Sequence, residues 1–507
     1  MNSVAAFPYV FFLGIGGIGM SALARWFQAN GHQVSGYDKT CTPLTEALSA
    51  EGIAVHYADA VEHIPTEVRT NRAQTLVVLT PAIPANHQEW AWLRENGYDI
   101  RKRSQVLGLL TAGQRTIAVA GTHGKTTTSS MVAHLLHHAG VDCSAFLGGI
   151  AVNLGSNLLL SYKLQAASYK LQAPGSELQE PETSNEQREA EQQKTNNEKR
   201  NTVVVEADEY DRSFLTLFPD VAIVTSTDAD HLDIYGDKEA LVESFKQFVG
   251  QIKPGGLLLL NYTAEPSLAD AVPAGVRVVR YGLEAGQAAD LYAANITAQG
   301  HQFRFDLHGP FGSAEGLELA VPGYHNVENM LAAACVAQLE GVQEDKLRTA
   351  VAAYRGVKRR FEFIVTAGRK VYVDDYAHHP REIEAFLRSL RALYPEQRLR
   401  VVFQPHLFTR TRDFAPGFAE SLSLADDVVM LDIYPARELP IAGVTSELIL
   451  SQITAPRKTL QTKEQVLAAA KVDTDFDVLA TVGAGDIDQL VPHLRTILTE
   501  RWNEAEA

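Results

Sequence analysis

The sequence predicts an α/β protein of about three domains, built on mostly parallel sheets. Short apolar runs alternate with longer helical stretches along most of the chain. Two glycine-rich loops each join an apolar run to a helical stretch. At 507 residues, the chain is too long for a single hydrophobic core. We place the domains at residues 1–112, 113–322 and 323–507.

The first domain shows a parallel, doubly wound pattern. Strands are expected at residues 9–13, 33–38 and 75–79, and a helix at 20–30. The loop after the first strand has the sequence Gly14-Ile-Gly-Gly-Ile-Gly19, and Asp38 follows about twenty residues later. The loop indicates a diphosphate at a helix N-terminus without naming the nucleotide. A tight crossover without ligand is the alternative.

The second glycine loop is the most informative stretch of the chain. It has the sequence Val119-Ala-Gly-Thr-His-Gly-Lys-Thr-Thr-Thr128, between an expected strand at 116–120 and an expected helix at 129–136. Backbone N–H groups in such a turn favour a phosphate. Lys125 adds a charge for the outer phosphates, and the Thr126 hydroxyl is suited to Mg²⁺. Val119 stands where the usual motif has glycine, so the match is to the short form, and an ordinary glycine turn is the alternative.

Acidic residues follow two further expected strands of the middle domain. Residues 202–209 are expected to form a buried strand whose end carries acids, Glu206 among them. Residues 221–225 lead to a stretch that contains Asp228, Asp230, His231 and Asp233. Ligands of open α/β sheets gather at the carboxyl ends of the strands. We therefore expect Lys125, Thr126, Glu206 and His231 to meet on one MgATP. Without those acidic neighbours, His231 would be interpreted as a packed or capping histidine.

The third α/β section begins near Gly323, with strands expected at residues 370–374, 400–403, 427–431 and 478–482. The middle domain is interrupted at residues 161–200, where the sequence is polar and the hexapeptide of residues 161–166 recurs at 168–173. Such a stretch cannot bury enough apolar surface to offset its ordering entropy. We expect a disordered surface insertion; a partner-binding element is the alternative.

Composition excludes several classes of protein. The formal net charge of −16 disfavours nucleic-acid binding. The three cysteines, Cys41, Cys143 and Cys335, show neither a disulfide framework nor a zinc spacing, which suits a reducing cytosol. The first apolar run, residues 7–20, contains four glycines and lacks the features of a signal peptide or a membrane span.

Several stretches together resemble the Mur ligases of bacterial peptidoglycan synthesis. They lie at residues 121–127, 206–211, 230–231, 323–329 and 356–362. Residues 374–380 and 403–412 narrow the resemblance to the members that add L-alanine to UDP-N-acetylmuramic acid, and residues 14–21 and 432–437 agree with this. The resemblance covers nearly the whole chain except the insertion.

The resemblance implies an N-terminal Rossmann-like UDP-binding domain, a central phosphate-loop ATPase domain and a C-terminal Rossmann-like domain. It implies a cytoplasmic reaction in which ATP phosphorylates the lactyl carboxylate of UDP-N-acetylmuramic acid and the amine of L-alanine attacks the acyl phosphate. Cations are needed where phosphate and carboxylate meet. The implied cofactors are ATP and Mg²⁺, and no NAD, nucleic acid or membrane partner is implied.

The resemblance also assigns residues. Lys125, Glu206 and His231 would be catalytic, with Thr126 and Glu206 on one Mg²⁺ and His231 on a second. The ATP-binding residues would be Gly121, Thr122, His123, Gly124, Lys125, Thr126, Thr127, Asn326 at the adenine, Asp375 at the ribose and Arg360 near the terminal phosphate. The UDP-sugar would lie against Gly16, Gly17, Ile18, Gly19 and Asp38. Tyr376, His406 and Arg410 would frame the amino acid.

One position departs from the family pattern. Many members have arginine directly after the histidine of the Pro-His motif, where this chain has Leu407. We therefore expect Arg410 to carry more of the carboxylate clamp. The alternatives are that Arg410 and Arg412 form surface ion pairs, and that His378 and His379 cap the helix that starts near Pro380.

Three competing functions are weighed against this one on the basis of the sequence. A second ligase of the family attaches a recycled peptide to the same nucleotide sugar, and the motif around His406 favours alanine over that peptide. A nicotinamide-dependent oxidoreductase is suggested by the first glycine loop and opposed by the second. A non-catalytic nucleotide-binding protein is opposed by Lys125, Glu206 and His231.

Overall fold

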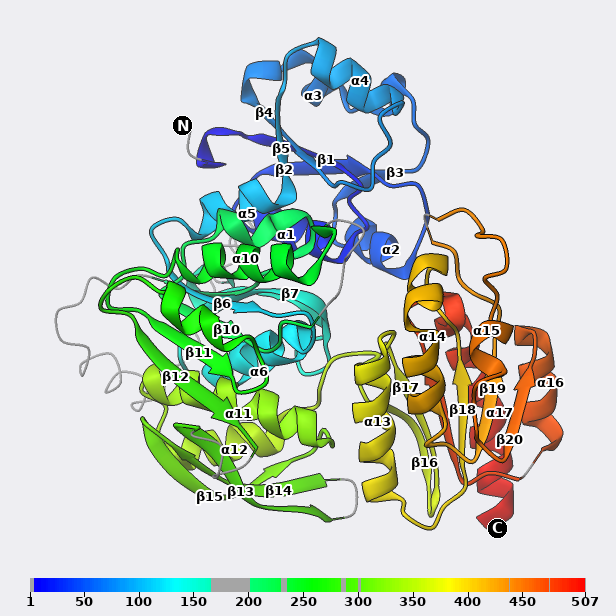
Figure 1. Ribbon diagram of the computed structural model, residues 1–507. Coiled ribbons are helices and arrows are strands. Elements are labelled where there is room, and N and C mark those ends of the chain that lie inside the picture. The colour runs from blue at the N-terminus through cyan, green and yellow to red at the C-terminus, as the bar shows by residue number, and fades with distance from the viewer. Residues whose placement is uncertain are drawn as a thin grey trace. The chain divides into compact units, whose positions relative to one another are not determined.

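A computed structural model describes residues 4–165, 201–228, 235–283, 289–299, 302–436, 438–473 and 475–506. The chain divides into two compact units. The first comprises Met1–Ala294, Leu307–Ala314 and Asn329–Val351, and the second comprises Asn295–Asp306, Glu315–Glu328 and Ala352–Ala507. The described strands form three sheets, which confirms the predicted α/β class (Figure 1).

The N-terminal sheet has the strand order β3-β2-β1-β4-β5, and all of its pairings are parallel. Its strands are β1 Tyr9–Leu13, β2 Gln33–Tyr37, β3 Ala54–His56, β4 Thr75–Leu79 and β5 Asp99–Lys102. Its helices are α1 Ile18–Ala29, α2 Pro43–Ala50, α3 Thr66–Thr70, α4 Gln88–Glu95 and α5 Arg103–Thr111. The central strand β1 is almost wholly buried, as its continuous apolar run predicts for a strand covered on both faces. The predicted doubly wound pattern is confirmed.

The middle sheet has the order β15-β14-β13-β12-β11-β10-β6-β9-β7-β8. Its strands are β6 Arg115–Ala120, β7 Cys143–Ala151, β8 Ser156–Leu159, β9 Thr202–Glu206, β10 Val221–Val224, β11 Leu257–Asn261, β12 Arg277–Gly282, β13 Leu291–Gln299, β14 Gln302–Gly309 and β15 Gly312–Leu319. Its helices are α6 Lys125–His138, α10 Lys238–Val249, α11 Tyr324–Leu339 and α12 Glu344–Ala353. Strand β6 pairs in parallel with both β9 and β10, so the ends of all three strands reach one edge of the sheet.

The C-terminal sheet has the order β16-β17-β21-β18-β19-β20. Its strands are β16 Glu362–Ala367, β17 Lys370–Asp375, β18 Leu399–Phe403, β19 Asp427–Met430, β20 Arg457–Leu460 and β21 Val478–Val482. Its helices are α13 Pro380–Leu393, α14 Phe408–Leu422, α15 Glu447–Leu450, α16 Lys463–Val472 and α17 Leu490–Glu506. The β16–β17 pair is antiparallel, and the other pairings are parallel.

Two predictions meet the limits of the described residues. Of the predicted insertion, residues 166–200 lie outside them, and so does His231. The helix predicted at residues 129–136 begins earlier, at Lys125, because Gly124 is its N-cap and the phosphate-loop lysine already belongs to the first turn. Within the described ranges, every helix is too short or too polar to span a bilayer.

Candidate functional site

The phosphate loop between β6 and α6 has a backbone that only glycine can supply. Gly121 and Gly124 have φ angles of +132° and +80°, in the left-handed region. A Cβ atom at Gly121 would lie 2.1 Å from the Thr225 hydroxyl oxygen. The two glycines therefore let the loop turn directly over the end of β10 and deliver Lys125 to the first turn of α6.

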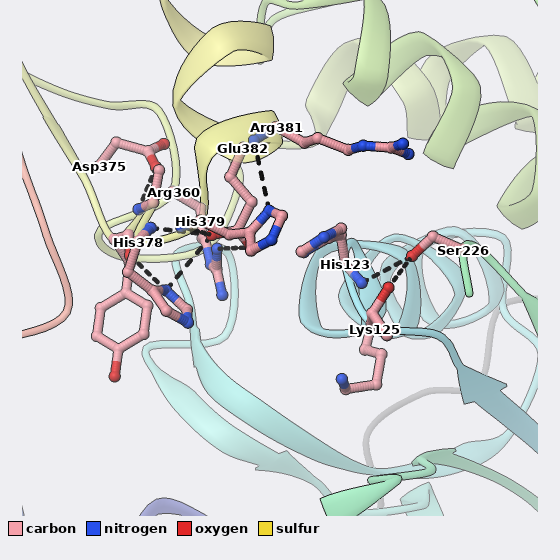
Figure 2. A network of polar contacts seen from close by, with 12 residues as sticks. His123, Lys125, Ser226, Arg360, Asp375, His378, His379, Arg381 and Glu382 are labelled. Carbon is pink, nitrogen blue, oxygen red and sulfur yellow. Dashed lines mark hydrogen bonds and ion pairs between the residues drawn. The ribbon is translucent and has the colours of Figure 1, made fainter. Parts of the chain in front are cut away.

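Hydroxyl groups after β10 fix the phosphate loop. The Thr122 and Ser226 hydroxyl oxygens are 2.8 Å apart. The His123 N–H donates to the Ser226 oxygen at 2.8 Å (Figure 2). The Asp228 N–H donates to the Thr122 hydroxyl at 3.0 Å. Ser226 is not among the predicted site residues, because its one signal in the sequence is a run of small polar residues after a buried strand. The loop is thus held in shape by its neighbouring strand.

Lys125 lies among carboxylates. Its ammonium contacts Glu209 at 2.7 and 2.9 Å and donates to the Gly121 carbonyl at 2.7 Å. The Lys125 side chain is 14% exposed, and that of Glu209 is 0% exposed. Burial lowers the pKa of Lys125, but the charges of Glu209, Asp208 and Glu206 outweigh it and hold that pKa above its usual value. The lysine is therefore a permanent cation.

Glu206 stands at the end of β9, beside this lysine. Its carboxylate accepts the Gly148 N–H at 2.9 Å, and a Cβ at residue 148 would lie 2.2 Å from the same oxygen. Carboxylates outnumber the lysine here, and the Thr126 hydroxyl adds another hard oxygen at the start of α6. This donor chemistry fits Mg²⁺. Among the described side chains, no group of three or more His, Cys, Asp or Glu residues makes a complete metal site.

The N-terminal glycine loop is organised by Asp38. The Gly16 N–H donates to one Asp38 oxygen at 2.8 Å, and the Thr40 N–H donates to the other at 3.2 Å. A Cβ at Gly16 would lie 2.6 Å from a Thr45 methyl group, whereas the nearest atom to a Cβ at Gly17 would be 3.6 Å away. Asp38 thus shapes the loop, and Gly17 presents an open backbone.

Arg103, which is not among the predicted site residues, lies between the first glycine loop and the loop that follows β9. A Cβ at Gly19 would lie 2.6 Å from its guanidinium, and the same group pairs with Asp208 at 3.4 Å. Ile18 begins α1, and its carbonyl accepts the Asn157 amide at 2.5 Å. The first glycine loop therefore contacts the loop that follows β9 through a cation. Nothing in the sequence around residue 103 marks this role.

In the second compact unit, Asp375 ends β17 and is buried. Its two oxygens accept the Phe361 and Ala377 N–H groups, each at 2.7 Å. Burial raises the pKa of Asp375 to about 6, although Arg360 and these N–H groups act in the opposite direction.

Asn326 is also buried, and its amide donates to the Pro322 carbonyl at 2.7 Å. Burial, with the Arg360 charge, lowers the pKa of His325 to about 4, so that its imidazole is neutral.

Tyr376 and Arg360 belong to one cluster. The Arg359 and Arg360 guanidinium groups each lie 5.1 Å from the centre of the Tyr376 ring. Glu382 lies 3.8 Å from Arg360 and accepts the His378 N–H at 2.9 Å (Figure 2). His379 is the N-cap of α13, with its ring accepting the Arg381 N–H, so the capping alternative is confirmed for this histidine.

The remaining amino-acid candidates follow β18. The His406 ring lies 6.2 Å from that of His378 and stacks at 5.8 Å on Tyr434. Leu407 has a φ of +71°, which is strained for leucine, and is the N-cap of α14. Arg410 is buried in the first turn of that helix.

Arg412, two residues further along α14, differs from Arg410. It is exposed and pairs with Asp413 at 2.6 Å, so the surface-pair alternative holds for Arg412. The structure thus brings Lys125, Glu206 and the phosphate loop together in the first unit. In the second unit it brings together Arg360, Asp375 and Tyr376.

Three family models match the chain in succession. Residues 9–115 match the Mur ligase family, catalytic domain; residues 119–337 match the Mur ligase middle domain; and residues 359–487 match the Mur ligase, glutamate ligase domain.

Curated relatives match nearly the full length. The chain is 45% identical over 493 residues to UDP-N-acetylmuramate–L-alanine ligase of Phocaeicola vulgatus, covering 97% of this chain and 98% of that one. It is 46% identical over 482 residues to the ligase of the same name from Porphyromonas gingivalis, covering 95% and 97%.

Solved structures share the fold. UDP-N-acetylmuramate–alanine ligase of Thermotoga maritima matches with a TM-score of 0.74 at 24% identity, over 98% of this chain and 99% of that one. A murein peptide ligase of Psychrobacter arcticus matches with a TM-score of 0.66 at 24% identity, over 97% and 98%.

Proposed function

This chain belongs to the Mur ligase family of peptidoglycan synthesis, and we propose that it joins L-alanine to the lactyl carboxylate of UDP-N-acetylmuramic acid with conversion of ATP to ADP and phosphate. The observation that carries the proposal is the preformed phosphate loop, with Lys125 only 14% exposed and under the charges of Glu209, Asp208 and Glu206. Relatives with this reaction in their name match 95% or more of the chain at 45–46% identity, which supports alanine as the amino acid.

Lys125 supplies the charge that the first step needs. A carboxylate and a triphosphate repel each other, and a fixed cation stabilises the charge that develops as the phosphoryl group moves. We assign Mg²⁺ to Thr126 and Glu206 as a second source of positive charge. His231 lies outside the described residues and remains our proposal for a second metal position.

The other substrate groups follow the geometry of the loops. We place the UDP diphosphate against the open backbone of Gly17, with Asp38 holding the loop in shape. Asn326 and Asp375 are assigned to the adenine and the ribose, and Arg360 to the terminal phosphate. Tyr376, His406 and Arg410 are assigned to alanine. The three cysteines are free thiols, in keeping with a reaction in the reducing cytoplasm.

The rival within the family is ligation of a recycled peptide, the activity named for the structural neighbour from Psychrobacter arcticus. A coupled assay of ADP release distinguishes the two. With UDP-N-acetylmuramic acid and Mg²⁺ present, we expect L-alanine to support turnover and the tripeptide L-alanyl-D-glutamyl-diaminopimelate to support almost none. Turnover with the tripeptide alone would replace our proposal by the rival, and glycine and L-serine in the same assay measure selectivity.

A further inference from the structure

Glu209 has no role in the reaction described above, although it makes the closest charged contact to the phosphate-loop lysine. It lies between β9 and the short helix Tyr210–Thr216. Its side chain is fully buried, and both of its oxygens contact the Lys125 ammonium, at 2.7 and 2.9 Å. A buried carboxylate held against a lysine that must serve a phosphate requires an explanation.

The Lys125 ammonium hydrogen-bonds to one Glu209 oxygen and to the Gly121 carbonyl, and the second Glu209 oxygen is an ion-pair contact. An ammonium group has three N–H donors. Three oxygen atoms surround it, two from Glu209 and one from the Gly121 carbonyl at 2.7 Å. A phosphate oxygen must therefore compete with the buried Glu209 carboxylate for the Lys125 ammonium.

The backbone around Glu209 is tightly fixed. The Tyr235 hydroxyl and the Arg212 N–H both donate to the Glu209 carbonyl, at 2.5 and 2.9 Å. Asp211 and Arg212 follow with left-handed φ angles of 52° and 54°, which hold a sharp turn. Lys125, in contrast, reaches Glu209 through a flexible four-carbon stem. We therefore expect the lysine, and not the carboxylate, to move when the contact is released.

We propose that Glu209 is a latch, a positioning residue that holds Lys125 across the phosphate loop until a nucleotide phosphate takes the lysine over. The proposal rests on the proposed function in one respect, that Lys125 binds the phosphates of ATP. The latch competes with the nucleotide for the ammonium and keeps the lysine ordered in the free protein. Removing the latch therefore tightens nucleotide binding, whereas removing a merely structural residue would weaken it.

The test compares two neighbouring carboxylates in the full chain. The probe is a non-hydrolysable ATP analogue, adenylyl imidodiphosphate, titrated with Mg²⁺ by calorimetry. Glu209→Gln removes the charge and keeps the size, so we expect the analogue to bind roughly ten-fold tighter or more, the value of a charge-assisted hydrogen bond. Asp208→Asn is the matched control. This substitution removes the same charge one residue away, from a carboxylate that pairs with Arg103. We expect its effect to stay within about three-fold.

Each outcome of the titrations either supports or contradicts the latch. Unchanged or weaker binding by folded Glu209→Gln contradicts the latch, and so does an equal gain in Asp208→Asn, which would indicate general repulsion. If Glu209→Gln fails to fold, Glu209→Asp keeps the charge and withdraws it by one methylene group. Tighter binding there supports the latch, and unchanged or weaker binding overturns it. Wild-type protein that does not bind the analogue refutes the proposed function and with it the premise of the latch, whereas wild-type binding without a gain in Glu209→Gln refutes the latch alone.

Discussion

At the scale of single residues, Lys125 completes a buried ion pair besides the catalytic role that we propose for it. Its counter-charge Glu209 is fully buried, so loss of the lysine leaves an uncompensated charge inside the protein. The sequence alone predicts a lysine that faces only a ligand. The structure shows that it also completes a buried ion pair, a long-range contact between residues 125 and 209 that no local pattern reveals.

We therefore expect Lys125→Ala to lower the free energy of unfolding by about 3 kcal/mol and the turnover rate by about a hundred-fold or more. Adding Glu209→Gln should restore most of the stability and none of the activity. Urea unfolding and ADP release measure the two effects. Lys102→Ala is the control, since its pair with Asp211 is exposed and contributes less than about 1 kcal/mol. An active Lys125→Ala protein would remove the lysine from the mechanism.

Asp375 makes stability depend on pH. Its pKa is about 6 in the folded protein, above the usual value of 3.8, so the folded state binds more protons between these values and stability falls as pH rises through them. His325 acts in the opposite direction, since its folded pKa of about 4 is below the usual 6.5. The contribution of Asp375 is therefore measured as the stability of the wild type minus that of a variant that lacks this carboxylate, in which His325 is retained.

We expect the stability of the wild type minus that of Asp375→Asn to fall by about 2 kcal/mol between pH 4 and pH 7. Chemical unfolding at several pH values gives this difference. A constant difference would show that Asp375 titrates at its ordinary pKa.

Arg410 and Arg412 offer a matched pair for the amino-acid pocket. The buried Arg410 is the assigned carboxylate clamp, and lysine cannot reproduce its two-pronged hydrogen bonding. We expect Arg410→Lys to raise the KM for L-alanine roughly ten-fold or more, with little change in the KM for ATP. Arg412→Lys should leave both unchanged, because Arg412 only pairs with Asp413 at the surface. An unchanged alanine KM in Arg410→Lys would move the clamp to another residue.

At the scale of elements, two neighbouring glycines of the loop between β1 and α1 have different roles: Gly16 is needed for the shape of the loop, and Gly17 is the proposed contact to the ligand. Gly16 has no room for a side chain, whereas the surroundings of Gly17 accept a methyl group at ordinary contact distance. Gly17→Ala should therefore keep near wild-type stability, weaken binding of UDP-N-acetylmuramic acid and leave ATP binding unchanged. Gly16→Ala should be destabilised in thermal unfolding. Normal UDP-sugar binding by Gly17→Ala would place the diphosphate elsewhere.

The bounds of strands could be predicted from the sequence better than the contacts between loops that are far apart in the chain. Buried parallel strands are continuous apolar runs, so the predictions for β1, β4 and β21 agree to the residue and most others to within one position. The strand predicted at residues 202–209 ends earlier, at Glu206. Helix starts were harder, because α6 begins inside the motif at Lys125. Ser226, Arg103 and Glu209 were missed because their roles arise only when the sheet order brings distant loops together.

At the scale of the whole molecule, the formal charge of −16 contrasts with two anionic substrates. Binding must therefore depend on local cations, and our proposal assigns this role to Lys125 in the first unit and to Arg360 in the second. The central claim is that this charge arrangement transfers a phosphoryl group from ATP to a carboxylate, and that the amine of L-alanine then displaces it.

Isotope transfer tests that claim most directly. UDP-N-acetylmuramic acid labelled with ¹⁸O in its lactyl carboxylate is incubated with the protein, ATP, Mg²⁺ and L-alanine, and the products are analysed by mass spectrometry. We expect UDP-N-acetylmuramoyl-L-alanine and inorganic phosphate that carries one ¹⁸O atom per turnover, because the bridging oxygen of the acyl phosphate leaves with the phosphate. Absence of the amide product, or phosphate free of label beside that product, would contradict it.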